Sequence, residues 1–108
     1  MEKTEMRKYK NENQISKMEF EVPVVVYCPL GSNYNKAFVK IEFTLGDTIV
    51  DFIDLEKFFK VELNGAHLTS EQLCASVFDT IKMEYQPKTL KVTVESNSHF
   101  TIRTIKEL

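Results

Sequence analysis

Strict alternation of apolar and polar residues most limits what this chain can fold into. In "AFVKIEFTL", residues 37–45, every second side chain from Val39 is apolar, and the intervening ones are polar or charged. A period of two residues is typical of a strand in a sheet that buries one face and leaves the other in water. The segment is therefore predicted to be a strand of an antiparallel sheet.

Three further segments have strand patterns. They are "MEFEVPVVVY" (residues 18–27), "KTLKVTVES" (residues 88–96) and "HFTIRTIKE" (residues 99–107). Pro23 lies within the first of them and has no N–H group to donate to a neighbouring strand. The first strand is therefore predicted to lie at an edge of the sheet or to contain a bulge.

Two helices are predicted between the strand pairs. Residues 51–63, "DFIDLEKFFKVEL", place apolar side chains at helical spacing, and Asn64-Gly65 follows as a stop signal. Thr69 and Gln72 then fit a capping box at the start of a second helix. The resulting order is ββααββ, an α+β domain with a four-stranded antiparallel sheet and two helices on one face.

Such a sheet has two unprotected edges, which invite pairing with other chains. A closed ring of subunits would join the sheets into a barrel and remove the edges. We therefore expect a homo-oligomer.

The 108 residues suffice for one domain, which we expect to span residues 19–108 after a flexible leader at residues 1–18. No apolar run is long enough for a membrane helix, and no secretory signal is visible after the first residues. The two cysteines are expected to be reduced, which favours a cytoplasmic location.

The charge pattern does not indicate a nucleic-acid-binding protein. The net charge is −2, and residues 1–18 carry five basic and three acidic residues. A nucleic-acid-binding domain has a clear basic patch, whereas a basic arm supplies only weak attraction to phosphate. A solvated tail is the simpler interpretation of this segment.

The two cysteines stand in different patterns. Cys74 falls in the apolar stripe of the second predicted helix and is expected in the core. Cys28 falls where the first strand meets its loop, as a nucleophile or as a half-buried structural thiol. The two thiols are 46 positions apart, and His67 and His99 are not paired by spacing, so no metal site is predicted.

Glu71 stands in the first turn of the second predicted helix. A carboxylate there is stabilised by the helix dipole. It could also accept hydrogen bonds from adjacent N–H groups of a ligand, an arrangement that suits a guanine-like edge. Both interpretations stay open at this point.

The element order and three short motifs resemble the tunnelling-fold (T-fold) proteins of deazaguanine metabolism, and the QueF-like family in particular. The motifs are "YCPLGSNYNKAFVKIEF", "LTSEQL" and "LKVTVES", and the resemblance covers residues 24–105. It implies a T-fold domain that oligomerises into a barrel. It also implies a substrate, 7-cyano-7-deazaguanine, either as a free base or within tRNA.

The resemblance further implies an amidine-forming transferase of archaeosine biosynthesis. Cys28 falls on the position of the catalytic cysteine, which adds to the nitrile carbon and forms a thioimide that ammonia or another nitrogen donor resolves. Glu71 falls on the glutamate that holds the base. The histidine that precedes this glutamate in the family is replaced by Ser70.

A second departure concerns the general acid. The family places an aspartic acid seven residues after the cysteine, where this chain has Asn35. A carboxamide can hydrogen-bond to the nitrile nitrogen, but it cannot deliver a proton as a general acid does. A protein that binds deazaguanine or purine without catalysis is therefore an alternative, and a structural oligomeric module is a third.

A nicotinamide-dependent nitrile reductase is the least favoured alternative. The reductase branch marks its NADPH site with a stretch "ESKS" at the start of the first helix. The matching stretch here, "DFIDLEKFF", keeps Asp51 and Leu55 but lacks the Ser and Lys pattern. No cofactor is therefore predicted.

Overall fold

The computed structural model describes residues 6–28, 33–97 and 100–108, with only the backbone described for Cys28 and Asn33. Its main element is a four-stranded antiparallel sheet with the order β2-β3-β5-β6. The strands are β2 (Lys17–Cys28), β3 (Asn33–Thr44), β5 (Leu90–Asn97) and β6 (Thr101–Glu107). All four predicted strands are confirmed, and β2, which contains Pro23, is an edge strand as expected.

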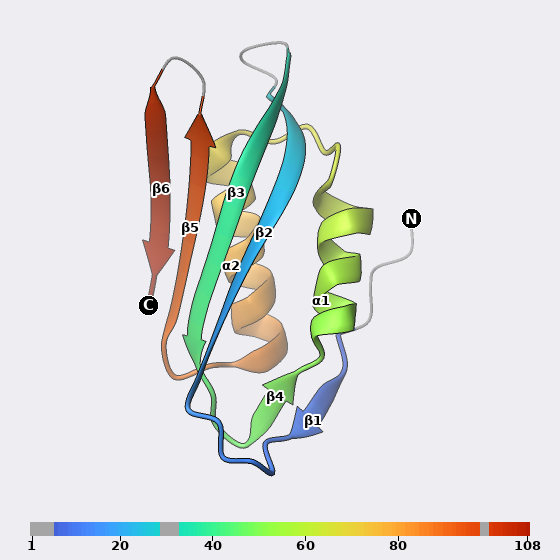
Figure 1. Cartoon of the computed structure of the whole chain (residues 1–108), viewed down its shortest axis with the longest axis vertical. Helices are drawn as coiled ribbons and strands as arrows, with labels where there is room; N and C mark the ends of the chain where they lie inside the picture. Colours follow the sequence, from blue (N-terminus) through green and yellow to red (C-terminus); the bar gives the residue numbers. More distant parts are fainter. Residues whose placement is uncertain (1–5, 29–32, 98–99) are drawn as a thin grey trace.

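The helices cover one face of this sheet (Figure 1). They are α1 (Phe52–Phe58), which continues as a π-helical turn over Phe59–Leu63, and α2 (Ser70–Tyr85). Figure 1 shows α2 behind β3 and β5 and α1 beside β2. The core is formed where the apolar sheet face meets the helices, by side chains such as Val39, Ile41, Phe43, Leu55, Leu73, Val77, Ile81, Val92 and Val94.

Local signals decide where the helices begin and end. The Asp51 carboxylate caps α1 by accepting from the N–H groups of Ile53 and Asp54. The predicted capping box of α2 is confirmed, with Thr69 and Gln72 each bonding the other's backbone N–H. After the π-helical turn, Gly65 adopts a φ of +81°, a left-handed conformation that glycine enters at little cost.

The N-terminal segment differs from the leader expected over residues 1–18. Within the described part, residues 8–10 form strand β1 (Lys8–Lys10), which pairs antiparallel with β4 (Thr48–Val50). Met6 is buried in the core, and Arg7 forms an ion pair with Asp54. Polar composition suggested a free segment, but backbone pairing and this ion pair hold it against the domain.

Candidate functional site

The C-terminal end of β2 is tied to the segment that leads into α2. The Tyr27 N–H donates to the Ala66 carbonyl at 2.8 Å, and the Leu68 N–H donates to the Tyr27 carbonyl at 3.0 Å. The Tyr27 ring also lies against the His67 ring, with centroids 4.6 Å apart. Because Cys28 follows Tyr27, these contacts bring the predicted nucleophile's backbone to the end of the domain where α2 begins (Figure 1).

The first turn of α2 is fixed to the sheet by a pair of serines. The hydroxyl oxygens of Ser70 and Ser96 lie 2.9 Å apart, which joins α2 to β5. Glu71 is the next residue along α2 and is exposed to solvent. The turn is therefore held in place while the Glu71 carboxylate stays exposed to solvent.

Asn35 belongs to the same end of the sheet. It pairs with Val26 of β2, is half-buried, and lies two residues before Ala37, which pairs with Ser96. Residues two apart in a strand lie on the same face, so Asn35 shares the helix-covered face with Ala37. The structure thus gathers Asn35, Ser70 and Glu71 at one end of the domain.

The remaining predicted residues have different outcomes. Cys28 is the last residue of β2 and pairs with Asn33, but its side chain lies outside the described part, as does the whole of His99. Cys74 is buried in the core as expected. Burial raises the pKa of the Cys74 thiol, which donates to the carbonyl of Val92 at 3.4 Å.

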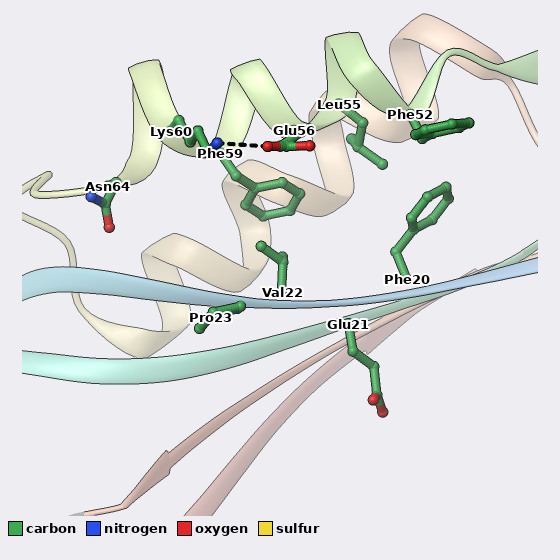
Figure 2. Close-up of a pocket in the computed structure, with 10 residues that line it drawn as sticks. All are labelled: Phe20, Glu21, Val22, Pro23, Phe52, Leu55, Glu56, Phe59, Lys60 and Asn64. Atoms are coloured by element: carbon green, nitrogen blue, oxygen red, sulfur yellow. Dashed lines mark ion pairs between the residues drawn. The ribbon is translucent and has the colours of Figure 1, made fainter.

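A groove of about 500 Å³ lies between β2 and α1 (Figure 2). Figure 2 shows Phe20 and Val22 of β2 facing Phe52 and Phe59, while Glu21 points to the other side of the strand. One ion pair lies at its rim, between Glu56 and Lys60. The described lining is mainly apolar and contains neither a cysteine nor any of the predicted site residues, so this groove is not the candidate site.

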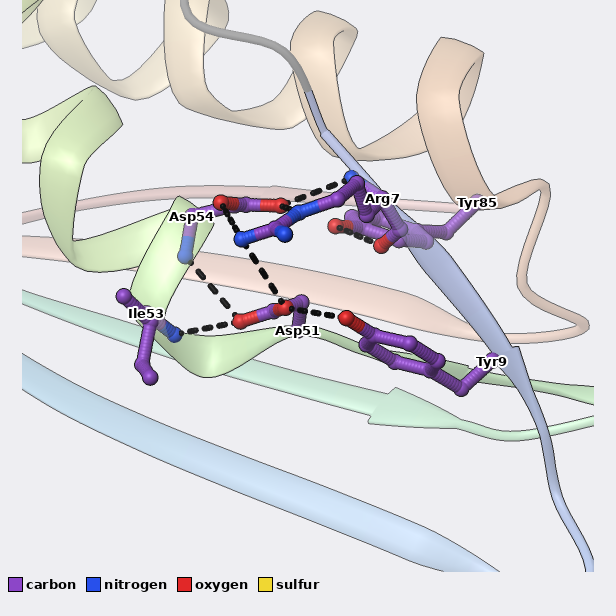
Figure 3. A network of polar contacts seen from close by, with 6 residues as sticks. All are labelled: Arg7, Tyr9, Asp51, Ile53, Asp54 and Tyr85. Carbon is purple, nitrogen blue, oxygen red and sulfur yellow. Dashed lines mark hydrogen bonds and ion pairs between the residues drawn. The ribbon is translucent and has the colours of Figure 1, made fainter.

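The start of α1 is occupied by a polar network that the sequence did not predict (Figure 3). The Arg7 guanidinium donates to both carboxylate oxygens of Asp54, at 2.8 and 2.9 Å, and the Tyr9 hydroxyl donates to Asp51 at 3.0 Å. The Arg7 hydrogen bonds lower the pKa of Asp54 to about 2. These contacts hold the described N-terminal segment against the start of α1.

No group of three or more histidine, cysteine or acidic side chains that could hold a metal ion occurs among the described residues. Within the same residues, no helix has the length and apolar character needed to span a membrane.

The fold and the end of the sheet described above define the class of the protein. It is an α+β domain of the T-fold type, with a four-stranded antiparallel sheet and helices on one face, which confirms the predicted fold. A solved structure with this fold is the crystal structure of the archaeosine synthase QueF-Like in its apo form. The TM-score is 0.79 at 18% sequence identity, with 85% of this chain and 92% of that chain covered.

The sequence alone gives no such match. No protein-family model matches the chain, and a search of curated proteins finds no match. The structural match, and not a sequence match, confirms the expected resemblance to the QueF-like family, and it does so at the level of the fold.

Sequence reasoning missed Ser96 as a partner of the candidate site. Alternation in "LKVTVES" places Ser96 on the apolar face with Val92 and Val94, but it does not show which helix residue meets it. Its hydrogen bond to Ser70 spans 26 positions and required the packed structure.

Proposed function

We propose that this protein is an amidine-forming transferase acting on the nitrile of 7-cyano-7-deazaguanine within tRNA, through a cysteine thioimide. The observation that carries the proposal is the fold shared with an archaeosine synthase over 85% of the chain. In this fold Cys28 ends β2 beside the segment that leads to the first turn of α2.

The proposed chemistry has two steps. The Cys28 thiolate adds to the nitrile carbon, so that a C–S bond forms, one C–N π bond breaks and the nitrogen takes a proton from water. Ammonia then adds to the thioimide carbon, one of its protons passes to the imide nitrogen, and the thiolate leaves with its bonding electron pair to give the amidine in its protonated form. A covalent intermediate of this kind divides one difficult substitution into two easier steps.

In this proposal, the other site residues bind and orient the cyano base. Glu71 accepts hydrogen bonds from the N–H groups of the purine-like edge, aided by its exposed position at the start of α2. The Asn35 amide donates to the nitrile nitrogen without transferring a proton. Ser70, whose hydroxyl meets Ser96, positions the turn that carries Glu71 next to the base.

An intact-mass measurement tests the covalent step. Incubation with the free cyano base should increase the protein mass by the mass of the ligand, and Cys28→Ala should abolish the increase. Cys74→Ala is the matched control, because Cys74 is the buried thiol and should leave adduct formation unchanged. No adduct in the wild type between pH 6 and 9 would refute the covalent mechanism.

A non-catalytic base-binding protein is the second candidate, and Asn35 is the observation that favours it. Asn35 cannot act as the general acid that the family has at this position, and general acid help is worth about 10²- to 10⁴-fold. Asn35→Asp distinguishes the two functions. An adduct that appears only in this variant, while the wild type binds the base reversibly, identifies the binding protein.

We also propose that the active form is a homo-oligomer. Within the described residues, β2 and β6 are the edges of the main sheet, and no strand pairs with the outer side of β6. Open edges favour addition of strands from another copy. Light scattering at micromolar concentration should give a mass several times that of the 12.6 kDa chain, and a monomeric mass would exclude the ring.

A further inference from the structure

The helix-free face of β3 carries alternating aromatic and basic side chains. Residues two apart in a strand share a face, so Tyr34, Lys36, Phe38 and Lys40 form one row on this face. The Tyr34 side chain is 63% exposed and that of Phe38 is 43% exposed. Two exposed aromatic rings therefore alternate with lysines along one face of the strand.

At the Tyr34 end of this row, neighbouring aromatic rings pack against one another. The Tyr34 ring meets the Tyr27 ring edge to face at 5.0 Å between centroids, and Tyr27 in turn lies against His67. One edge contact leaves most of the Tyr34 ring open to a ligand. Further along the row, the Lys36 ammonium lies 5.4 Å from the centre of the Phe38 ring.

The charges around the row favour a phosphate backbone near Lys36. The β2 residues opposite Tyr34, Lys36 and Phe38 are uncharged. They are Tyr27, Val25 and Pro23. Glu95 lies beside Phe38 on β5, and Arg103 neutralises it at 2.8 Å. Lys40 has two acidic neighbours, since Glu21 lies opposite it and Glu42 lies 4.0 Å away. The part of the row that favours phosphate therefore ends before Lys40.

We propose that this row, Tyr34, Lys36 and Phe38, binds single-stranded RNA next to the candidate site. Exposed aromatic rings stack on successive bases, and an interleaved lysine attracts the phosphates between them. Tyr34 and Phe38 are four residues apart, about 13 Å along the strand, so each ring receives its own base.

The position of the row relative to the site indicates which part of the ligand it meets. Tyr34 and Asn35 are consecutive in β3 and therefore lie on opposite faces of the sheet. A base held beside Asn35 cannot also stack on Tyr34, whereas nucleotides flanking that base in a polynucleotide can. The inference deepens the proposed function, on which it rests for the choice of RNA as the ligand.

Binding of a fluorescein-labelled single-stranded oligouridine, followed by anisotropy, tests the inference. Tyr34→Leu should weaken binding roughly 5- to 150-fold, the range for the loss of one stacked base. Lys36→Gln should lower the slope of log affinity against log salt by about 0.7. The matched control is Phe52→Leu, an aromatic residue with 62% exposure at the start of α1, which should bind like the wild type.

Other outcomes overturn the inference. They are no binding by the wild type, equal losses in Tyr34→Leu and Phe52→Leu, or a change of molar mass in Tyr34→Leu that identifies the row as a subunit contact. The free-base adduct assay separates this test from the proposed function, because Tyr34→Leu should form the Cys28 adduct normally. Missing adduct in the wild type, with weakened oligouridine binding in Tyr34→Leu, would refute the transferase and leave the RNA surface intact.

Discussion

The hydroxyl oxygens of Ser70 and Ser96 lie 2.9 Å apart and join the first turn of α2 to β5. This bond, together with the Thr69 cap, determines where the following residue, Glu71, stands relative to the sheet. A carboxylate selects a flat heterocycle only if its position is fixed before the ligand arrives, because ordering it afterwards costs binding free energy. The serine pair therefore links the packing of α2 on β5 to the position of Glu71, on which the proposed recognition depends.

Replacing either serine should weaken both stability and recognition. Ser70→Ala and Ser96→Ala should each lower the free energy of unfolding by about 1 kcal/mol, the net worth of one hydrogen bond. The double variant should lose little more than either single variant, since both remove the same bond. Urea unfolding measures these values, and strictly additive losses would contradict the pairing.

Glu71→Gln should weaken binding of the free cyano base by roughly 10- to 100-fold, since a hydrogen bond to a charged group is worth about 1.5–3 kcal/mol. Calorimetry with the purified variant measures the affinity. Glu84→Gln, near the other end of α2, is the control and should bind normally. Equal affinities of Glu71→Gln and the wild type would remove Glu71 from the site.

The Arg7–Asp54 pair should make stability depend on pH in acid. Because the pKa of Asp54 falls to about 2 in the folded state, its contribution is complete above the ordinary carboxyl pKa near 4 and is lost as the pH falls towards 2. Asp54→Asn should therefore be less stable than the wild type at neutral pH and show a smaller fall between pH 4 and 2. Thermal unfolding across this range checks the slope, with Asp79→Asn, an exposed acid on α2, as the control.

Tyr85 should lose its hydroxyl proton only at unusually high pH. Burial, with the nearby negative charge of Asp54, raises its pKa to about 12, and its hydroxyl donates to the Arg7 carbonyl at 3.3 Å. Its contribution to stability is complete below the ordinary tyrosine pKa of about 10 and is lost as the pH rises towards 12. The chain has no tryptophan, so absorbance at alkaline pH reports its four tyrosines directly. Tyr85→Phe should remove the component near pH 12, and its persistence would contradict this assignment.

The elements of the main sheet and the helices were predictable because their signals are local. Alternation marked the strands, and the Thr69–Gln72 box marked the start of α2, since each pattern depends on neighbours within four residues. The pairing of β1 with β4 was missed, because a strand of three exposed residues is too short to show a periodicity. For the same reason, the flexible leader expected over residues 1–18 did not anticipate that residues 8–10 pair with the domain.

The candidate site, too, was predictable from the sequence only in part. Motif resemblance pointed to Cys28, Asn35, Ser70 and Glu71, and the structure brings the last three to one end of the domain. The serine partner and the exposed aromatic row were not predictable from composition. Alternation tells which residues share a face, but not whether a helix or water covers that face.

The sequence by itself determined the order of the two helices and the four strands of the main sheet, the apolar face of that sheet and the capping of α2, because periodicity and capping act over a few residues. Only the tertiary structure decided that Arg7 reaches Asp54 across 47 positions, that segment 64–68 bonds the end of β2, and that Tyr34 stays open to water. Such contacts join residues far apart in the chain, and they form only when burial of the shared core brings those segments together.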